Sequence, residues 1–236
     1  MDQAILQVPN PMLIKITRNF FYPLVILFPV SLYMVFVYAP EEETMGIVQK
    51  IFYYHVSAGW VFLLAFGLVF LGSVAFLITQ RQVWDTFAAS SAELGVVFCS
   101  ISLTTGPIWA KPVWGIWWTW DARLTSTLVE WLIYVAYLML RANVPEPTKR
   151  ANLSAVFGIL GALDVPIVYF SIRWWRTQHP QPVMGGGGYL DPQMRLAFYV
   201  CLLTFTLLYF FMLGRRIELA QAQETLTSLK RRWARK

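Results

Sequence analysis

Residues 58–79 read AGWVFLLAFGLVFLGSVAFLIT and contain no charged side chain. An apolar stretch of about 20 residues is long enough to cross the hydrocarbon core of a bilayer as an α-helix. Because the bilayer core offers no water, the backbone polar groups of such a segment must be satisfied internally, which a helix achieves alone. The stretch therefore predicts a transmembrane helix, and it sets the fold class of the chain.

Five further stretches share this apolar character. The six predicted spans are residues 20–38, 58–79, 87–106, 124–140, 153–170 and 193–213. Of the 236 residues, 57% are hydrophobic and only 14% are charged, whereas charged residues make up about a quarter of soluble domains. The connecting segments are short, so residues 1–236 are predicted to form a single six-helix membrane domain, an all-α integral membrane protein. The first span is too long for the core of a cleaved signal peptide, and we expect it to be retained as a signal anchor.

The distribution of Lys and Arg predicts how the spans are oriented. Six spans place both termini on one side, and if that side is cytoplasmic, thirteen of the 19 Lys and Arg residues lie inside. Seven of these belong to a basic tail at residues 214–236. The asymmetry predicts that the N and C termini are cytoplasmic. The net charge of +6 then reflects a tail that contacts lipid headgroups, and no nucleic-acid partner is expected.

Three outer segments follow from this topology, at residues 40–57, 107–123 and 171–192. The chain contains two histidines, His55 in the first of these segments and His179 in the third. The parity of the spans alone places both imidazoles on the same face of the membrane as the second outer segment. This conclusion holds even if inside and outside are exchanged.

The second outer segment carries the run WGIWWTWD at residues 114–121. Its tryptophans are Trp114, Trp117, Trp118 and Trp120, and it ends on Asp121. Two interpretations are open. Indole rings gather at membrane–water interfaces as an aromatic belt, and they also form flat platforms for apolar ligands.

The residues of the outer face together favour a haem site. Two neutral imidazoles can ligate a haem iron above and below the plane of the porphyrin, and indoles suit the flat macrocycle. Cations to pair with the propionates are available on the same face, namely Lys111, Arg123, Arg173 and Arg176. The alternative for each histidine is a solvated loop side chain. Zinc is disfavoured because the outer face offers no cysteine to complete its coordination.

The segment PVWGIWWTWDARLTSTLVEWLIY, residues 112–134, resembles the tryptophan-rich WWD signature of haem-handling membrane proteins. With six spans and flanking histidines, the chain is similar to the haem exporter protein C family of bacterial cytochrome c maturation. The resemblance implies a periplasmic WWD loop at residues 107–124 that holds haem b non-covalently and transiently. It places His55 and His179 as axial ligands of the iron. The other haem-binding residues that it implies are Trp114, Trp117, Trp118, Trp120, Asp121 and Arg123.

The same resemblance implies a location and a set of partners. The protein is expected in the bacterial inner membrane as a multi-pass protein, with its haem site facing the periplasm. It is expected to pass haem to a membrane-anchored haem chaperone, without being an enzyme itself. The implied partners also include the ATPase and permease subunits of an ATP-binding cassette complex and a small single-span accessory subunit. No Walker motif occurs in the chain, so any ATP hydrolysis must come from a partner.

Several polar residues fall within or beside the predicted spans. Glu93, Glu130 and Asp164 are ionisable groups at membrane depth, where such groups either function directly or pair with polar neighbours. Pro166 predicts a kink in the fifth span. Asp121 either caps the helix that begins near residue 124 or contacts a partner.

Two other functions compete with haem delivery. A b-type electron-transfer subunit would also bind haem, but such subunits place their histidines within helices, and no span has a histidine at its middle. A solute transporter would use the tryptophans only as belts. A CxxCH motif is absent, so the chain does not attach haem covalently by that route.

Overall fold

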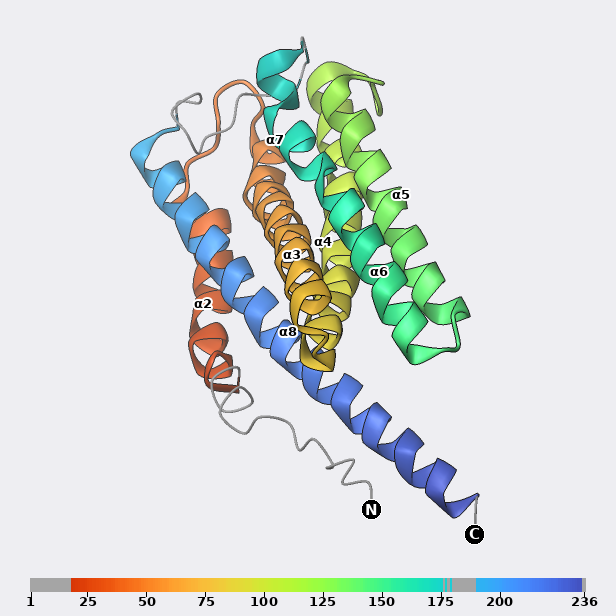
Figure 1. The fold of residues 1–236 in the computed structure, drawn as a ribbon. Coiled ribbons are helices and arrows are strands. Elements are labelled where there is room, and N and C mark those ends of the chain that lie inside the picture. The colour runs from red at the N-terminus through yellow and green to blue at the C-terminus, as the bar shows by residue number, and fades with distance from the viewer. Residues whose placement is uncertain (1–17, 176, 178, 180–189, 235–236) are drawn as a thin grey trace.

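The computed structural model describes residues 18–175, 177, 179 and 190–234, and these form a bundle of helices (Figure 1). The elements are α2 (Phe21–Tyr33), the π-helix η1 (Met34–Tyr38), the 3-10 helix η2 (Ile47–Lys50), α3 (Ile51–Thr79), α4 (Gln82–Trp114), α5 (Ala122–Asn143), α6 (Pro147–Ala162), α7 (Asp164–Trp174) and α8 (Pro192–Trp233). The described residues contain no β-strand, only an isolated bridge between Glu42 and Gly46. The predicted all-α class is confirmed.

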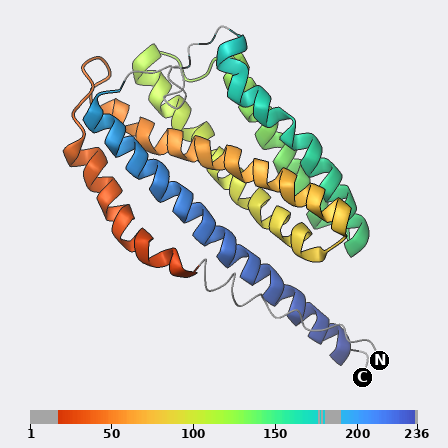
Figure 2. The same ribbon diagram turned by 60° about the vertical axis from the view of Figure 1, so that its left-hand side comes forward.

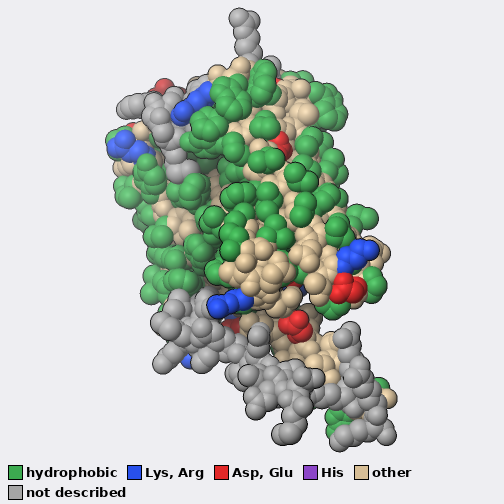
Figure 3. Space-filling view, viewed as in Figure 1, with side chains coloured by type: hydrophobic (Ala, Val, Ile, Leu, Met, Phe, Trp, Pro, Cys, Tyr) green, Lys and Arg blue, Asp and Glu red, His purple; other side chains and the backbone are tan. Residues whose placement is uncertain are grey.

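Six helical segments are long and apolar enough to cross a membrane, as the sequence predicts. They are Phe21–Tyr38, Ile47–Thr79, Gln82–Trp114, Ala122–Asn143, Pro147–Trp174 and Pro192–Lys230. Most of these segments are longer than the apolar stretches that predicted them. Hydropathy detects only the lipid-facing part of a helix, and the hydrogen-bonded ladder continues through more polar turns at either end. Figure 3 shows the apolar surface over the middle of one face and the charged side chains toward its ends.

The helices lie in three groups. Helices α3 and α4 form the centre and pack against each other along their length. Helices α2 and α8 pack together on one side, and α5, α6 and α7 pack together on the other (Figures 1 and 2). The turn that joins α3 to α4 and the turn that joins α5 to α6 lie at the same end of the bundle, and α8 extends beyond this end. The opposite end holds the segment between α4 and α5 and the start of α8.

The core between α3, α4 and α5 depends on one close aromatic stack. The rings of Phe66 and Tyr134 are parallel within 2°, with centroids 3.7 Å apart, and both side chains are buried. Gly95 of α4 faces this stack, since a Cβ atom at Gly95 would come within 2.4 Å of Cε1 of Phe66. A side chain at residue 95 would therefore force the stack apart.

Among the described residues, two ion pairs join different helices. Arg141 of α5 donates to both carboxylate oxygens of Asp85 in α4, at 2.5 and 2.9 Å. Glu93 of α4 accepts two hydrogen bonds from Arg216 of α8. Glu93 therefore takes the paired role that the sequence left open.

The fifth span is interrupted. Helix α6 ends at Ala162 and α7 begins at Asp164, with Leu163 as a turn between them. Pro166 explains the position of the break, because it has no N–H to donate to the carbonyl of Ala162, four residues earlier. The predicted kink is confirmed.

At the other end of α6, backbone N–H groups of Lys149 and Thr148 donate to the Glu146 carboxylate and hold its pKa below the ordinary value.

Candidate functional site

His55 lies in the second turn of α3, not in a loop. Helix α3 begins at Ile51, several residues before the predicted span, and this brings His55 into regular structure. Its ring is buried, and Nδ1 lies 2.9 Å from the hydroxyl oxygen of Thr105 on α4. Gly106 is packed against the same ring, since a Cβ atom there would approach Cε1 of His55 to 3.3 Å. Helix α4 thus fixes the position of the ring.

The expected WWD loop is shorter than residues 107–124, because residues 107–114 continue α4. The helix carries two prolines, Pro107 and Pro112, and ends at Trp114. Gly115 then takes φ 78°, a left-handed conformation that glycine adopts without steric cost and that commonly follows the end of a helix. The ammonium group of Lys111 donates to the carbonyl of Gly115 at 2.8 Å. The irregular segment is therefore residues 115–121.

Asp121 is the N-cap of α5. Its Oδ1 accepts a hydrogen bond from the backbone N–H of Leu124 at 2.9 Å. Its Oδ2 accepts from the hydroxyls of Thr119 at 3.2 Å and Thr177 at 2.8 Å. The oxygen of Thr177 in turn accepts from the backbone N–H of His179 at 3.0 Å. Asp121 therefore caps a helix and also joins the Trp-rich segment to the segment that carries His179.

The rings of His55 and His179 lie close together. Their centroids are 6.5 Å apart and their planes are inclined by 35°. Two imidazoles that ligate one metal ion from opposite sides, each with a bond of about 2 Å, have centroids roughly 6 Å apart. The spacing therefore matches that of two imidazoles that share one metal ion.

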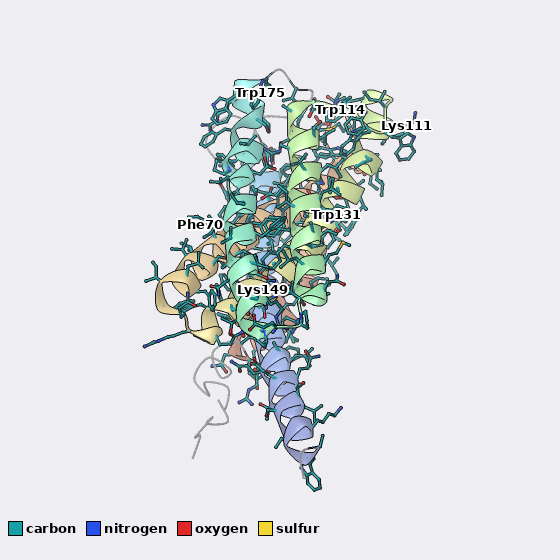
Figure 4. The ribbon with its side chains drawn as sticks, turned by 45° about the vertical axis from the view of Figure 1, so that its right-hand side comes forward. Phe70, Lys111, Trp114, Trp131, Lys149 and Trp175 are labelled. Atoms are coloured by element: carbon teal, nitrogen blue, oxygen red, sulfur yellow. The ribbon has the colours of Figure 1, made fainter. Side chains whose placement is uncertain are left out.

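A cavity of about 490 Å³ opens beside the two imidazoles. This volume lies within the range of small-molecule sites, about 300–1,000 Å³. Of the residues expected to bind haem, those that line the cavity are His55, His179, Trp114, Trp117, Trp118, Asp121 and Arg123. Trp120 does not line it: its side chain is 76% exposed and meets Trp118 edge to face, with centroids 5.8 Å apart. Figure 4 shows Trp114 and Lys111 at one end of the bundle together with Trp175, and Lys149 at the other.

Comparison with known proteins assigns the chain to a family. A profile of the family described as Heme exporter protein C matches residues 8–232. The chain belongs to this family. The Heme exporter protein C of Bradyrhizobium diazoefficiens is 36% identical over 187 residues, 78% of this chain and 71% of the relative. The protein of the same name from Escherichia coli strain K12 is 32% identical over 160 residues, 68% of this chain and 65% of the relative. A ccmC-like mitochondrial protein of cytochrome c biosynthesis from Marchantia polymorpha is 32% identical over 189 residues, 79% of this chain and 80% of the relative.

Membership of the haem exporter protein C family implies a role in haem handling for cytochrome c maturation. The donor groups of the cavity fit that cargo. Within the described part of the chain, the indole N–H of Trp118 and that of Trp109 are buried without a hydrogen-bond partner. The rest of the lining is largely apolar and aromatic, as a macrocycle requires.

The expected propionate partners take different positions. Arg123 lines the cavity and donates through Nη1 to the carbonyl of Val168 at 2.9 Å. A guanidinium group has five N–H donors, so Arg123 retains donors for an anion. Lys111 is exposed and bonded to Gly115, and Arg173 is exposed. Arg176 lies outside the described residues.

Sequence reasoning missed part of the lining. Trp109 bridges His55 and Trp114, with ring centroids 5.8 and 6.4 Å away. No sequence spacing marks Trp109, because residues five apart on an α-helix lie about 140° apart around its axis; its place follows only from the continuation of α4 to Trp114. Tyr169 and Phe170 line the cavity from α7, and their positions follow from the break in the fifth span.

Proposed function

We propose that the protein binds haem b non-covalently in this cavity and delivers it during the maturation of c-type cytochromes. His55 and His179 are the axial ligands of the iron. The single observation that carries the proposal is the 6.5 Å separation of the two imidazole rings beside an apolar cavity. Family membership supports it, because haem handling is the role of the family.

Different side chains contact different parts of the haem. The imidazoles of His55 and His179 offer nitrogen lone pairs to the iron, and the rings of Trp114, Trp117 and Trp118 give the macrocycle an apolar surface that excludes water. Trp120 supports this surface through its contact with Trp118. The N–H donors of Arg123 that do not bond to Val168 and the indole N–H of Trp118 suit propionate oxygens. Haem itself supplies the redox-active iron, and the protein forms no covalent bond with the porphyrin.

We further propose that the cavity faces the periplasm at the bacterial inner membrane, with both termini cytoplasmic. The recipient is a membrane-anchored haem chaperone. An ATP-binding cassette ATPase with its permease and a small single-span subunit are the other partners. The protein acts by binding and delivery rather than by catalysing a bond change. The Lys and Arg of the tail support this orientation.

The test is the absorption spectrum of the purified protein, in which we expect the bands of a low-spin b-type haem. His55→Ala and His179→Ala should each give a five-coordinate or water-ligated spectrum that added imidazole partly reverses. The double variant should lose most of the haem. If both single variants keep the wild-type spectrum while haem remains bound, the ligand assignment is wrong.

The haem-binding role of the Trp-rich segment is tested by replacing two tryptophans that lie at opposite ends of the bundle. Trp118→Phe removes an indole N–H from the cavity and should lower haem occupancy. Trp84→Phe is the matched control, since Trp84 is exposed in the first turn of α4 at the end of the bundle remote from the cavity. Equal haem content in both variants would favour the belt interpretation of the Trp-rich segment.

A further inference from the structure

The hydrogen bonds around Thr105 favour one tautomer of His55. The Thr105 hydroxyl lies 2.7 Å from the carbonyl of Ile101, which can only accept a hydrogen bond. A threonine hydroxyl has a single hydrogen to donate. If that hydrogen goes to the carbonyl, the oxygen accepts from Nδ1–H of His55 at 2.9 Å, and two hydrogen bonds form. The opposite arrangement forms only one of these bonds.

This arrangement leaves Nε2 of His55 without a hydrogen, so that it presents its lone pair. A neutral imidazole binds a metal through its unprotonated nitrogen, and a hydrogen bond from the other nitrogen fixes both the tautomer and the ring orientation. The contact with Gly106 limits rotation of the same ring. Thr105 thus sets the chemistry of His55 before any cargo arrives.

The second imidazole is held by a different threonine. The side-chain oxygen of Thr177 accepts from the backbone N–H of His179 two residues later, which is a common threonine turn. Its hydroxyl hydrogen is donated to Oδ2 of Asp121 at 2.8 Å. Asp121 is itself bonded to Leu124 of α5 through its other oxygen. A continuous set of hydrogen bonds therefore runs from the start of α5 to the backbone of His179.

We propose that Thr105 and Thr177 are the positioning residues of the two axial ligands. Thr105 selects the Nδ1–H tautomer of His55, and Thr177 anchors the His179 segment to Asp121. The inference rests on the proposed function for its meaning, but its first test uses protein without haem. Neither threonine touches the cargo; each acts through the histidine that it holds.

The first experiment measures the tautomer directly. The chain has two histidines, so ¹⁵N-histidine labelling of the haem-free protein in detergent gives two imidazole spin systems, which His179→Ala assigns. We expect His55 to be in the Nδ1–H form in the wild type and in Thr105→Ser, which keeps the hydroxyl. Thr105→Val removes it and should shift the population toward the Nε2–H form. An unchanged tautomer in Thr105→Val would overturn the role of Thr105.

The matched control is the neighbouring residue Thr104. Its exposed hydroxyl donates only to carbonyls of its own helix, those of Ser100 and Ile101. Thr104→Val therefore removes the same group from the same helix without touching His55. Its tautomer populations should match those of the wild type, and a shift as large as that of Thr105→Val would also contradict the proposal.

The second experiment measures haem affinity by titration of the haem-free protein. Loss of a residue that hydrogen-bonds to a metal ligand typically lowers metal affinity by about 10–100-fold, and we expect losses of haem affinity of that order in Thr105→Val and Thr177→Val. Thr177→Ser, which keeps both hydrogen bonds, should bind like the wild type, as should Thr104→Val. Wild-type affinity in both valine variants would refute the positioning role.

The two proposals fail in different ways. If the wild-type protein binds no haem but Thr105→Val still shifts the tautomer, the proposed function fails and the assignment of Thr105 stands. In haem-loaded protein, Thr105→Val should also raise the reduction potential, because an imidazole without a hydrogen-bonded Nδ1–H is a weaker donor to iron. If neither the reduction potential nor the tautomer population shifts in Thr105→Val, Thr105 does not position His55.

Discussion

At the scale of single residues, Asp121 shows how one carboxylate serves several contacts. The sequence left open whether this residue caps a helix or contacts a partner. It accepts from the backbone of Leu124 and from the hydroxyls of Thr119 and Thr177. The two oxygens have separate partners, so substitutions can separate the roles.

Asp121→Asn and Asp121→Ala are expected to differ. The asparagine keeps one oxygen and can still cap α5, but its NH₂ group cannot accept from Thr177. We expect near wild-type thermal stability and reduced haem binding. The alanine loses the cap as well and should lose about 1 kcal/mol of stability. Thermal unfolding in detergent and haem titration measure the two effects, and identical behaviour of the two variants would show that the separation is wrong.

Gly95 offers a second prediction at this scale. Gly95→Ala places a Cβ atom 2.4 Å from the ring of Phe66, which is stacked on Tyr134, and overpacking of this kind costs about 1–3 kcal/mol. Gly67→Ala is the control, since no heavy atom lies within 4 Å of a Cβ atom there. We expect a lower melting temperature only for Gly95→Ala. Equal melting temperatures would show that the stack moves freely.

At the scale of helices, the Asp85–Arg141 pair joins α4 to α5. Asp85 is 3% exposed and Arg141 16%, and removing one partner of a buried pair costs about 3–5 kcal/mol because the remaining charge is uncompensated. Asp85→Leu should therefore destabilise the protein strongly, while Asp85→Leu with Arg141→Met should recover part of the loss. Arg215→Gln removes an arginine that is 55% exposed and pairs with Glu218 of its own helix, and it should change stability by less than about 1 kcal/mol. Additive losses in the double variant would contradict this coupling.

The number and order of the membrane spans were predictable from the sequence, but the ends of their helices were not. Hydropathy placed the second span at residues 58–79, and His55 therefore in a loop, because the turns before residue 58 contain polar side chains. The helix nevertheless begins at Ile51. Pro107 and Pro112 made a loop the natural expectation after residue 106, yet α4 continues to Trp114 and ends only where Gly115 turns left-handed.

The candidate site was predictable in its residue types and only partly in its geometry. Span parity placed His55, His179 and the Trp-rich segment at one end, but no pattern in a single sequence reveals that Thr105 lies opposite His55. Thr105 and His55 are fifty residues apart on different helices. Thr177 likewise contacts Asp121 across fifty-six residues. Such contacts depend on tertiary packing, which periodicity does not encode.

At the scale of the whole molecule, the prediction concerns which end of the bundle faces the cytoplasm. Reporter fusions at Arg81, Glu146 and Trp233 should read cytoplasmic, and fusions at Glu43 and Trp117 should read periplasmic, because the Lys and Arg excess lies on the former side. Figure 1 places the α3–α4 and α5–α6 turns and the end of α8 at one end of the bundle. Opposite readings at Arg81 and Trp233 would contradict the arrangement.

Helix α8 is a single rod of 42 residues, and at about 1.5 Å per residue it measures about 63 Å, roughly twice the hydrocarbon thickness of a bilayer. It starts at Pro192, at the end of the bundle that holds the cavity, and extends beyond the other end (Figures 1 and 2). A break like that at Leu163 would absorb a bending force, but no break interrupts α8. A force on the exposed C-terminal end of α8 is therefore transmitted along the whole helix. Helix α8 is a rigid connection between the aqueous phases on the two sides of the membrane.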